Sequence, residues 1–465
     1  LSTALAHRIV QSGVARVGWL APSSAAFPVM IFAAAKAGVP FVPLNYRLAD
    51  PMLLDQIDRL ERCLLVVDGD NAARVASSAQ ATLIDRDSLI EQVLNEASDE
   101  GALAGEESAE AAYWLFTSGT TGPPKISLLG HDHLSSYILS TVELCSAEED
   151  EAILVSVPPY HIAGLATVLS SFFAGRRMVY LANFTAIDWV TLAREQGVTQ
   201  AMVVPTMLQR ILDECTEPDT LPRLRSLSYG GGRMPKDVIE QALVQLPHVD
   251  FANAYGLTET SSTITLLGPD DIRAAFSSDD PVVAKRITSV GKPVPGIELR
   301  LVKADGADAE LGETGEIWVR GPQVSGRYLG QPGRGEDDWF ATRDEGELDA
   351  DGYLYLHGRM DDVIVRGGEN ISPGEIEDVL REHAAVADIA VVAQPDSEWG
   401  EVPVAVLVLG DAEVSDEELA AFVRSRLRSS RVPDRFVRVD ELPYNDMGKV
   451  LRTNIRELLA ADLGS

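Results

Sequence analysis

The chain has 465 residues, enough for one large domain and a smaller one, and its 46% hydrophobic content is ordinary for a soluble globular protein. Its net charge of −32 argues against nucleic acid as a partner, because binding a phosphate backbone requires a basic surface. No stretch approaches the roughly 20 uninterrupted apolar residues of a membrane span. The N-terminal residues lack a basic segment followed by an apolar core, so we expect no signal peptide.

The chain has three cysteines, Cys63, Cys145 and Cys215. This odd and sparse set contains no CxxC pair, so it predicts neither a disulfide framework nor a zinc site. We expect each cysteine to be a small buried hydrophobic residue in a protein of the reducing cytoplasm.

Helices and strands are predicted to alternate in the N-terminal part of the chain. The apolar pattern predicts helices at residues 5–11 and 27–37 and short buried strands at residues 17–20, 41–44 and 64–67. Such alternation is typical of crossover connections and a largely parallel sheet. We therefore expect an α/β fold.

A candidate phosphate-binding loop lies within residues 113–127, which read YWLFTSGTTGPPKIS and follow an acidic, solvated connection at 95–112. A buried strand at 113–116 leads directly into Gly, Ser and Thr residues, whose backbone N–H groups can converge on phosphate oxygens. The spacing differs from the Walker loop, and an ordinary surface turn is the alternative. The candidate binding residues are Thr117, Ser118, Gly119, Thr120, Thr121, Gly122 and Lys125.

Further strands are predicted at 153–157, 178–181, 201–204 and 226–229. Tyr160 and His161 follow the first of these, at the strand end where open α/β sheets bind ligands, although a lone histidine is more often structural. After the last strand come Gly230, Gly231 and Gly232, which would let a flat ligand lie against the backbone. The adjacent Arg233 is a candidate anion contact.

A second candidate nucleotide element is NAYGLTET at residues 253–260. Tyr255 can stack on a purine ring, and Thr258 can donate to a phosphate oxygen. Glu259 is a hard oxygen ligand suited to the Mg²⁺ that accompanies ATP. The alternative is a helix start capped by Thr258.

The rest of the chain is predicted to be β-rich and then mixed. Residues 269–289 are polar and are expected to form an exposed excursion, and strands are predicted at 297–302 and 316–320. Asp344 could accept hydrogen bonds from both ribose hydroxyls, although its acidic surroundings are also typical of solvent-exposed surface. Beyond residue 360 the pattern changes to a small α+β region, so we expect domains at 1–360 and 361–465.

Taken in order, these motifs resemble those of the adenylate-forming superfamily, which includes acyl-CoA synthetases, peptide-synthetase adenylation domains and luciferases. The resemblance rests on TSGTTGPPK, YGLTE, the Asp344 and Arg359 region and PYNDMGK at 443–449, and it runs from about residue 17 to residue 449. It implies a large N-terminal α/β region with several subdomains and a small mobile C-terminal domain. Two departures are Arg343, where glycine is usual, and the absence of the further N-terminal segment that members usually carry. Because the first residue is Leu and not Met, we expect this sequence to lack the true N-terminus.

The resemblance implies roles for individual residues. His161 would line the pocket for the carboxylate substrate, and Asp344 with Arg359 would bind the ribose. Lys449 would lie against the substrate carboxylate and the α-phosphate, where it would stabilise the transition state. The glycines at 230–232 and Asn253, Tyr255 and Gly256 would contact the nucleotide, Asp361 would be a hinge, and Gly367 and Gly368 would meet the site during thioester formation.

The implied activity is that of an ATP-dependent acyl- or aryl-CoA ligase, with ATP, Mg²⁺ and CoA as cofactors. The segment at 158–164 lacks the Asp that amino-acid adenylation domains use, which disfavours amino acids, but aryl, fatty and dicarboxylic acids remain candidates. Three alternatives are transfer to an acyl carrier protein, luciferase-type oxygenation, and a nucleotide-binding regulator without catalysis. The sequence leaves open whether the protein is a monomer or a homodimer.

Overall fold

The computed structural model describes residues 1–95, 112–117, 124–217, 220–333, 335, 338–367, 369–410, 412–445 and 448–462. The chain packs into two compact units. Unit 1 comprises Leu1–Ile287, Pro293–Glu298 and Arg320–Phe340, and unit 2 comprises Thr288–Lys292, Leu299–Val319 and Ala341–Ser465. The expected domain boundary between residues 360 and 361 remains a prediction.

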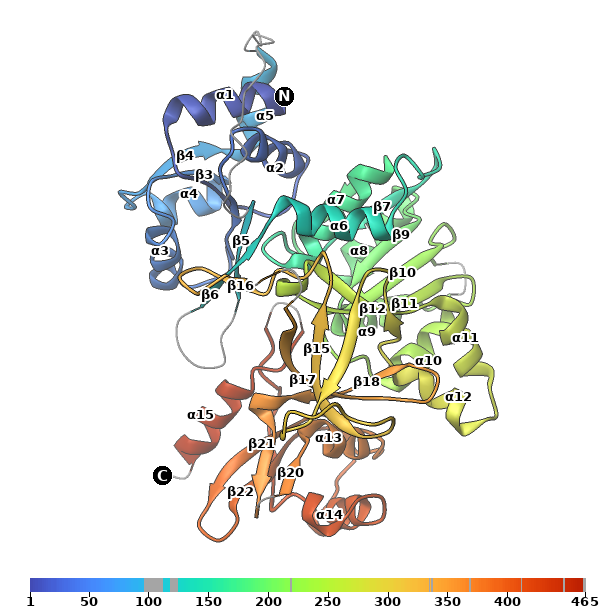
Figure 1. The fold of residues 1–465 in the computed structure, drawn as a ribbon. Coiled ribbons are helices and arrows are strands. Elements are labelled where there is room, and N and C mark those ends of the chain that lie inside the picture. Colours follow the sequence, from blue (N-terminus) through green and yellow to red (C-terminus); the bar gives the residue numbers. More distant parts are fainter. Residues whose placement is uncertain are drawn as a thin grey trace. The chain divides into compact units, whose positions relative to one another are not determined.

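Two sheets of seven strands each form the framework of unit 1 over its described residues (Figure 1). In spatial order, sheet A contains β16 (Arg327–Tyr328), β6 (Lys125–Leu129), β5 (Tyr113–Thr117), β2 (Phe41–Pro43), β1 (Arg16–Leu20), β3 (Cys63–Val67) and β4 (Ala81–Asp85). Sheet B contains β13 (Lys292–Pro293), β12 (Ser262–Leu267), β11 (Asp250–Leu257), β10 (Ser226–Gly230), β9 (Gln200–Val203), β7 (Ala152–Val155) and β8 (Arg177–Tyr180).

The central strands of both sheets are parallel, and antiparallel strands are added at one edge. β5, β2, β1, β3 and β4 run parallel, as do β8, β7, β9, β10 and β11. β6, β16 and β12 pair in the antiparallel sense. The predicted α/β fold with mainly parallel sheets is therefore confirmed.

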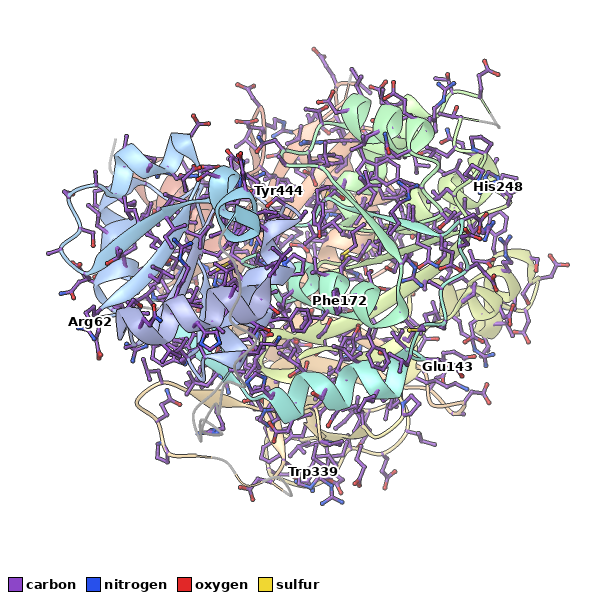
Figure 2. The ribbon with its side chains drawn as sticks, turned by 90° about the horizontal axis from the view of Figure 1, so that it is seen from above. Arg62, Glu143, Phe172, His248, Trp339 and Tyr444 are labelled. Atoms are coloured by element: carbon purple, nitrogen blue, oxygen red, sulfur yellow. The ribbon has the colours of Figure 1, made fainter. Side chains whose placement is uncertain are left out.

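Helices cover both faces of sheet A (Figure 1). The helices of unit 1 are α1 (Ser2–Ser12), α2 (Ala26–Lys36), α3 (Asp50–Asp58), α4 (Gly69–Val75), α5 (Arg86–Asn95), α6 (His131–Thr141), α7 (Ile162–Ala174), α8 (Ala186–Glu195), α9 (Pro205–Glu214), α10 (Lys236–Gln245), α11 (Pro269–Ser277) and α12 (Pro281–Lys285), with short 3₁₀ turns η1 (Thr258–Thr260) and η2 (Arg286–Thr288). Buried side chains of α1, α2 and α7 share one apolar core with sheet A, and α3 and α4 close the opposite face. Phe172 of α7 is labelled in Figure 2. Its ring packs on that of Phe32 of α2, with centroids 4.7 Å apart. This core holds the strand ends of both sheets in fixed positions.

Unit 2 contains two further sheets. Sheet C consists of β14 (Glu298–Val302), β15 (Thr314–Arg320), β17 (Phe340–Leu348) and β18 (Leu354–Arg359), and sheet D of β20 (Glu369–Ile371), β19 (Ile364–Arg366), β22 (Gly400–Leu409), β21 (Val386–Asp396) and β23 (Arg435–Arg438). The turn η3 (Met360–Asp362) connects the two, and α13 (Pro373–Arg381), α14 (Asp416–Arg424), η4 (Ser429–Arg431) and α15 (Arg452–Asp462) complete the unit. The expected β-rich subdomain and the small α+β region are both present.

One sequence expectation was wrong, and another missed the local structure. Residues 269–289 are mostly exposed or half-buried, as expected, but they form α11 and α12, and Ile272 and Ala275 of α11 are buried. Cys145 is exposed, in a turn with φ 53°, whereas Cys63 and Cys215 are buried as expected and all three thiols are free. None of the described helices is long and apolar enough to cross a membrane.

The C-terminal helix α15 is anchored by a largely buried ion pair. Arg452 donates from Nη1 and Nη2 to the Glu377 carboxylate at 2.6 and 3.1 Å, and also to the Val391 carbonyl. Burial alone would raise the pKa of Glu377, but Arg452 lowers it below its ordinary value. Arg452 is thus the main partner that keeps Glu377 charged inside the fold, and the Val391 N–H also donates to Glu377 Oε1, at 2.6 Å.

Replacing Arg452 with Met should destabilise the protein by about 3 kcal/mol, because it leaves the Glu377 charge buried without its ion-pair partner. Chemical denaturation at pH 7 measures the loss. A carboxylate whose folded-state pKa is depressed contributes stability above its unfolded pKa of about 4.3, and this contribution is lost as the pH falls. The difference between wild type and variant should therefore be fully present at pH 7 and should shrink as the pH falls below about 4.3.

Arg438→Met is the matched control, since the Arg438–Asp416 pair is 2.6 Å long but 40% and 50% exposed. It should cost less than about 1 kcal/mol. Equal losses in the two variants would show that the Arg452 pair is not an anchor.

Candidate active site

The turn that carries Glu259 is tightly constrained. β11 ends at Leu257 and runs directly into η1, where Thr260 Oγ1 donates to the carbonyls of Leu257 and Ser262 at 3.0 and 2.8 Å. Ser262 follows with φ 108°, a region that only glycine adopts readily. A Cβ on Gly256 would lie 1.8 Å from the Ser262 carbonyl oxygen, so this position requires glycine. The backbone therefore fixes where Glu259 lies.

Tyr328 connects Glu259 to Lys125. The Tyr328 hydroxyl donates to Glu259 Oε1 at 2.7 Å, and Lys125 Nζ lies 5.3 Å from the centre of the Tyr328 ring. Glu259 is buried, so the hydroxyl stabilises a carboxylate that has little water around it. Through Tyr328, the structure thus links Lys125, on the strand that follows the phosphate-type loop, to the acid predicted to bind Mg²⁺.

The segment from Gly321 to Tyr328 holds this arrangement in place, and we call it the strap. Tyr328 pairs with Ser127 in the ladder between β16 and β6. The backbone N–H groups of Ser325 and Gly326 donate to the Glu259 carbonyl at 2.9 and 3.0 Å. The buried Gln323 donates to the carbonyls of Thr260 and Thr263 at 3.0 and 2.8 Å. The strap therefore bonds to the turn at Glu259 and to β6.

Sequence reasoning did not assign a functional role to any strap residue. Tyr328 belongs to a strand of two residues, too short for a periodic signal, and Gln323 looks like an ordinary polar residue of a turn. The sequence does show an aromatic residue, Tyr328, shortly after two glycines. That pattern alone does not predict that its hydroxyl bonds to Glu259.

The remaining predicted residues of unit 1 gather at the carboxyl ends of neighbouring strands of sheet B. Tyr229 of β10 is the register partner of Asn253 of β11, and Gly230 that of Ala254. A Cβ on Gly230 would lie 2.3 Å from the Ala254 carbonyl oxygen, so the two backbones approach closely. Asn253 and Tyr255 are both buried.

His161 begins α7 directly beyond β7, in the same sheet as β10 and β11. Its ring lies 4.6 Å from that of Tyr160, which in turn meets Tyr46 at 5.3 Å. A Cβ on Gly164 would lie 2.3 Å from the Pro158 carbonyl oxygen, so the turn at His161 is closely packed. His161 is therefore held in a closely packed turn, and its place in the substrate pocket stays a prediction.

In unit 2, Asp344 of β17 faces Arg359 of β18 as its register partner. Asp344 Oδ1 lies 3.0 Å from Arg359 Nε, and Arg359 Nη1 donates to the Thr342 carbonyl at 3.2 Å. The Asp344 backbone N–H donates to Thr342 Oγ1 at 3.1 Å. Arg343 lies between them with φ 64°, the left-handed conformation that the usual glycine would adopt without strain.

Lys449 lies on a tight turn directly before α15. Its N–H donates to Asn445 Oδ1 at 2.9 Å, and its carbonyl accepts from the Asn445 N–H at 2.9 Å. Although the residue as a whole is exposed, the pKa of Lys449 lies below its usual value, first through desolvation and then through Arg359. Asp344 and Asp362 act in the opposite direction. Lys449 is therefore close enough to the candidate ribose acid to feel its charge.

Other predicted residues are only partly described. Thr117 Oγ1 donates to the Lys125 carbonyl at 3.4 Å, Asp361 lies in η3, and Gly367 has φ 57° and donates to the Trp399 carbonyl at 2.7 Å. The predicted residues that lie outside the described part of the chain are Ser118, Gly119, Thr120, Thr121, Gly122 and Gly368.

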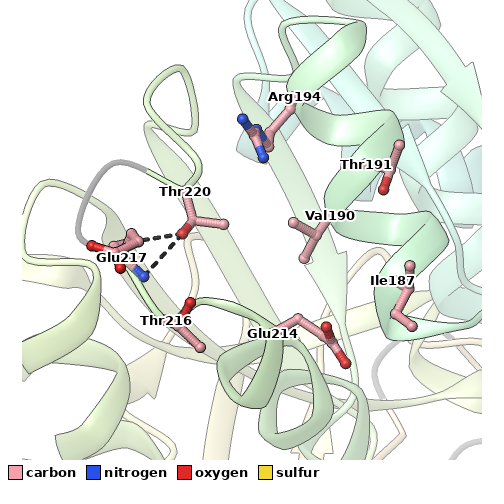
Figure 3. Close-up of a pocket in the computed structure, with 8 residues that line it drawn as sticks. All are labelled: Ile187, Val190, Thr191, Arg194, Glu214, Thr216, Glu217 and Thr220. Atoms are coloured by element: carbon pink, nitrogen blue, oxygen red, sulfur yellow. Dashed lines mark hydrogen bonds between the residues drawn. The ribbon is translucent and has the colours of Figure 1, made fainter.

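A cavity of about 340 Å³ lies between α8 and the end of α9 (Figure 3). Ile187, Val190 and Arg194 of α8 line one side, and Glu217 and Thr220 line the other. None of its lining residues belongs to a predicted motif, so this cavity is not part of the candidate site.

Comparison with known proteins identifies the family. Residues 1–329 match the AMP-binding enzyme family and residues 375–449 match the AMP-binding enzyme C-terminal domain. A 2-succinylbenzoate–CoA ligase of Bacillus cereus is 34% identical over 92% of this chain and 85% of its own length. A fatty acid–[acyl-carrier-protein] ligase of Streptomyces coeruleorubidus is 31% identical over 99% of this chain and 90% of its own length.

Solved structures agree with this result. The o-succinylbenzoate CoA synthetase of Bacillus subtilis in complex with its acyl-adenylate intermediate has a TM-score of 0.82 and 30% identity, covering 98% of this chain and 91% of its own. The same synthetase in complex with ATP and magnesium also has a TM-score of 0.82, with 29% identity, covering 98% of this chain and 92% of its own.

The chain belongs to the AMP-binding enzyme family, the adenylate-forming superfamily that its motifs resemble. Within that family it is an AMP-forming acid–thiol ligase of the acyl- or aryl-CoA synthetase type.

Replacing Tyr328 with Phe should weaken Mg²⁺-dependent ATP binding roughly tenfold, because a carboxylate that loses its orienting hydrogen bond is a poorer ligand. Calorimetric titration with ATP at several Mg²⁺ concentrations measures the change without relying on turnover.

Tyr180→Phe is the control, since the Tyr180 hydroxyl lies 3.5 Å from Met178 Sδ on β8, outside the predicted motifs. It should leave ATP affinity unchanged. If Tyr328→Phe also left it unchanged, Tyr328 would have no role in holding Glu259 for the metal.

Proposed function

We propose that the chain is a CoA ligase for an aromatic acid with a second carboxylate, the substrate class of 2-succinylbenzoate. The similarity to ligases and synthetases of that name carries the proposal. Arg233 supports it, since this exposed cation directly follows the Gly230–Gly232 edge and could pair with the second carboxylate. The absence of an aspartate between residues 158 and 164 further disfavours an α-ammonium substrate.

The first step joins the acid to AMP. A carboxylate oxygen attacks the α-phosphorus of ATP, the bond from that phosphorus to the bridging oxygen breaks, and pyrophosphate leaves with the electron pair. We assign Lys449 to the space between the substrate carboxylate and the α-phosphate, where its charge would offset their repulsion. Asp344 and Arg359 would hold the ribose, and Lys125 would contact the leaving phosphates.

Magnesium fits the residues present. Mg²⁺ usually takes one or two protein carboxylates and completes its shell with water and phosphate oxygens. Glu259 is one buried carboxylate, oriented by the hydroxyl of Tyr328, and Lys125 lies over the ring of the same tyrosine. When bound, the ion would neutralise charge on the leaving phosphates, while the strap holds Glu259 in position.

The second step transfers the acyl group to CoA. The thiol sulfur attacks the acyl carbon, the bond to the AMP oxygen breaks, and the thioester forms as the thiol proton is lost. The turn at Gly367 and Gly368 would meet the site in this step, after the region beyond the hinge at Asp361 has rotated.

A second candidate function is transfer of the same acyl-adenylate to the phosphopantetheine of an acyl carrier protein. The similarity to the carrier-protein ligase of Streptomyces coeruleorubidus favours it. The adenylation step would be unchanged, so only the acceptor distinguishes the two functions.

Pyrophosphate exchange with a panel of aryl, fatty and dicarboxylic acids tests the substrate class, and repeating the positives with CoA and with a carrier protein identifies the acceptor. We expect exchange with 2-succinylbenzoate and thioester formation with CoA. Arg233→Ala should raise KM for this dicarboxylate about tenfold or more, and leave KM for a monocarboxylic aryl acid unchanged. Preference for a fatty acid would overturn the proposed class.

Lys449→Ala should slow adenylation by about 10²–10³-fold, because a charge that stabilises the transition state is lost. The protonated lysine is the active form and its pKa is depressed, so kcat/KM for adenylation should fall as the pH rises, beginning below the usual lysine range near 10.4. A series of rates from pH 7 to 10 measures this decline.

The Lys449→Arg variant tests whether the high-pH decline in adenylation comes from deprotonation of Lys449. It should retain part of the activity and lose the high-pH decline, because arginine stays charged throughout. The same decline in wild type and Lys449→Arg would assign the titration to another group.

A further inference from the structure

Asp361 and Asp362 are adjacent acids in η3, and they pair with arginines from two different elements. Asp361 Oδ1 accepts from Arg343 Nη2 at 2.7 Å, which joins η3 to β17 of sheet C. Asp362 Oδ1 accepts from Arg456 Nη2 at 2.8 Å, and Asp362 Oδ2 lies 3.6 Å from Arg452 Nε. The connection between sheets C and D is therefore held on one side by Arg343 and on the other by α15.

The backbone conformation of Arg343 is unfavourable for arginine. Its φ of 64° is a conformation that disfavours residues with a Cβ, and no turn chemistry of arginine compensates for this. Its guanidinium also lies 3.9 Å from Glu316 Oε1 on β15, a buried oxygen without a hydrogen-bond partner. An arginine held in a strained backbone between two acids is expected where its side chain has a task.

The ion pairs on the two sides of η3 differ in how well they are shielded from solvent. On the α15 side, Asp362 meets Arg452, which is also fixed by the buried Glu377. On the sheet C side, the Arg343 and Asp361 side chains are 55% and 35% exposed, so solvent and salt weaken their pair. The Arg343 pair is thus the one that can open while Asp362, α15 and the Lys449 turn stay together.

We propose that Arg343 is a positioning residue that, through Asp361, holds η3 in the arrangement that places Lys449 near Asp344 and Arg359. Opening the pair releases this arrangement, which serves adenylation, and favours the arrangement that serves thioester formation. The inference rests on the proposed function, because it assigns Lys449 to the first step.

Arg343→Ala and Asp361→Asn should each slow pyrophosphate exchange about two- to fivefold, the range of an exposed ion pair. Thioester formation from an acyl-adenylate supplied ready-made should stay unchanged or rise. The double variant should match either single variant, because both remove the same interaction. High salt should reduce exchange in the wild type toward the level of the variants.

Arg343→Lys should restore part of the exchange rate, since it keeps the charge. Lys303→Ala is the matched control: the Lys303–Glu313 pair is 3.0 Å long, 34% and 46% exposed and also in unit 2, but far along the chain from η3. It should leave both half-reactions unchanged. An equal fall in both half-reactions of Arg343→Ala, or the same effect in Lys303→Ala, would overturn the inference.

Trypsin cleavage gives a readout that needs no catalysis, because Arg359 and Arg366 flank η3. Mass spectrometry should detect cleavage there several-fold faster in Arg343→Ala and Asp361→Asn than in the wild type or Lys303→Ala. Equal cleavage rates would overturn the inference. If trypsin cleaves the wild type more slowly than the variants but the wild type forms no adenylate, the proposed function is contradicted. The role of the Arg343–Asp361 pair in holding η3 is still supported in that case.

Discussion

The pairing of the strap with β6 is the constraint on which the rest of the unit 1 site depends. Lys125 and Glu259 are distant in the sequence and carry opposite charges, and neither could hold the other in place through solvent. The strap solves this with backbone hydrogen bonds to both segments, and it places the Tyr328 ring and hydroxyl between the two side chains. Groups held in this way need little reorganisation when a charged ligand arrives.

Backbone strain accompanies the candidate site in both units. Ser261, Ser262 and Arg343 are non-glycine residues with φ between 56° and 108°, and all three adjoin residues assigned to nucleotide or metal binding. Each conformation is held by its surroundings: the Thr260 hydroxyl bonds the Ser262 carbonyl, and the Arg343 side chain pairs with Asp361. Rigid, mildly strained turns are typical of positions where side-chain direction matters more than local stability.

The sequence was sufficient for the features that depend on neighbours along the chain. The strand before Lys125, the turn at Glu259 and the acid at Asp344 each follow from a local run of residues, and the apolar alternation predicted the parallel strands. Tyr328 could not be found this way, because its role arises from pairing with a strand some two hundred positions away. Helix α11 was missed, although Pro269 begins it and acids lie in its first turn, both of which are helix-start signals. The segment is mostly polar, and its two buried residues, Ile272 and Ala275, were too few to give a clear apolar periodicity.

One of the three cysteine thiols is exposed and two are buried, which gives the protein a single site for labelling with a thiol-reactive dye. Burial raises the pKa of Cys63 and Cys215 to about 11, so both remain protonated and shielded at neutral pH. Cys145 is exposed on the turn between α6 and β7. A maleimide dye should therefore attach at one defined position of the natural sequence, which permits fluorescence and single-molecule studies without first removing any cysteine.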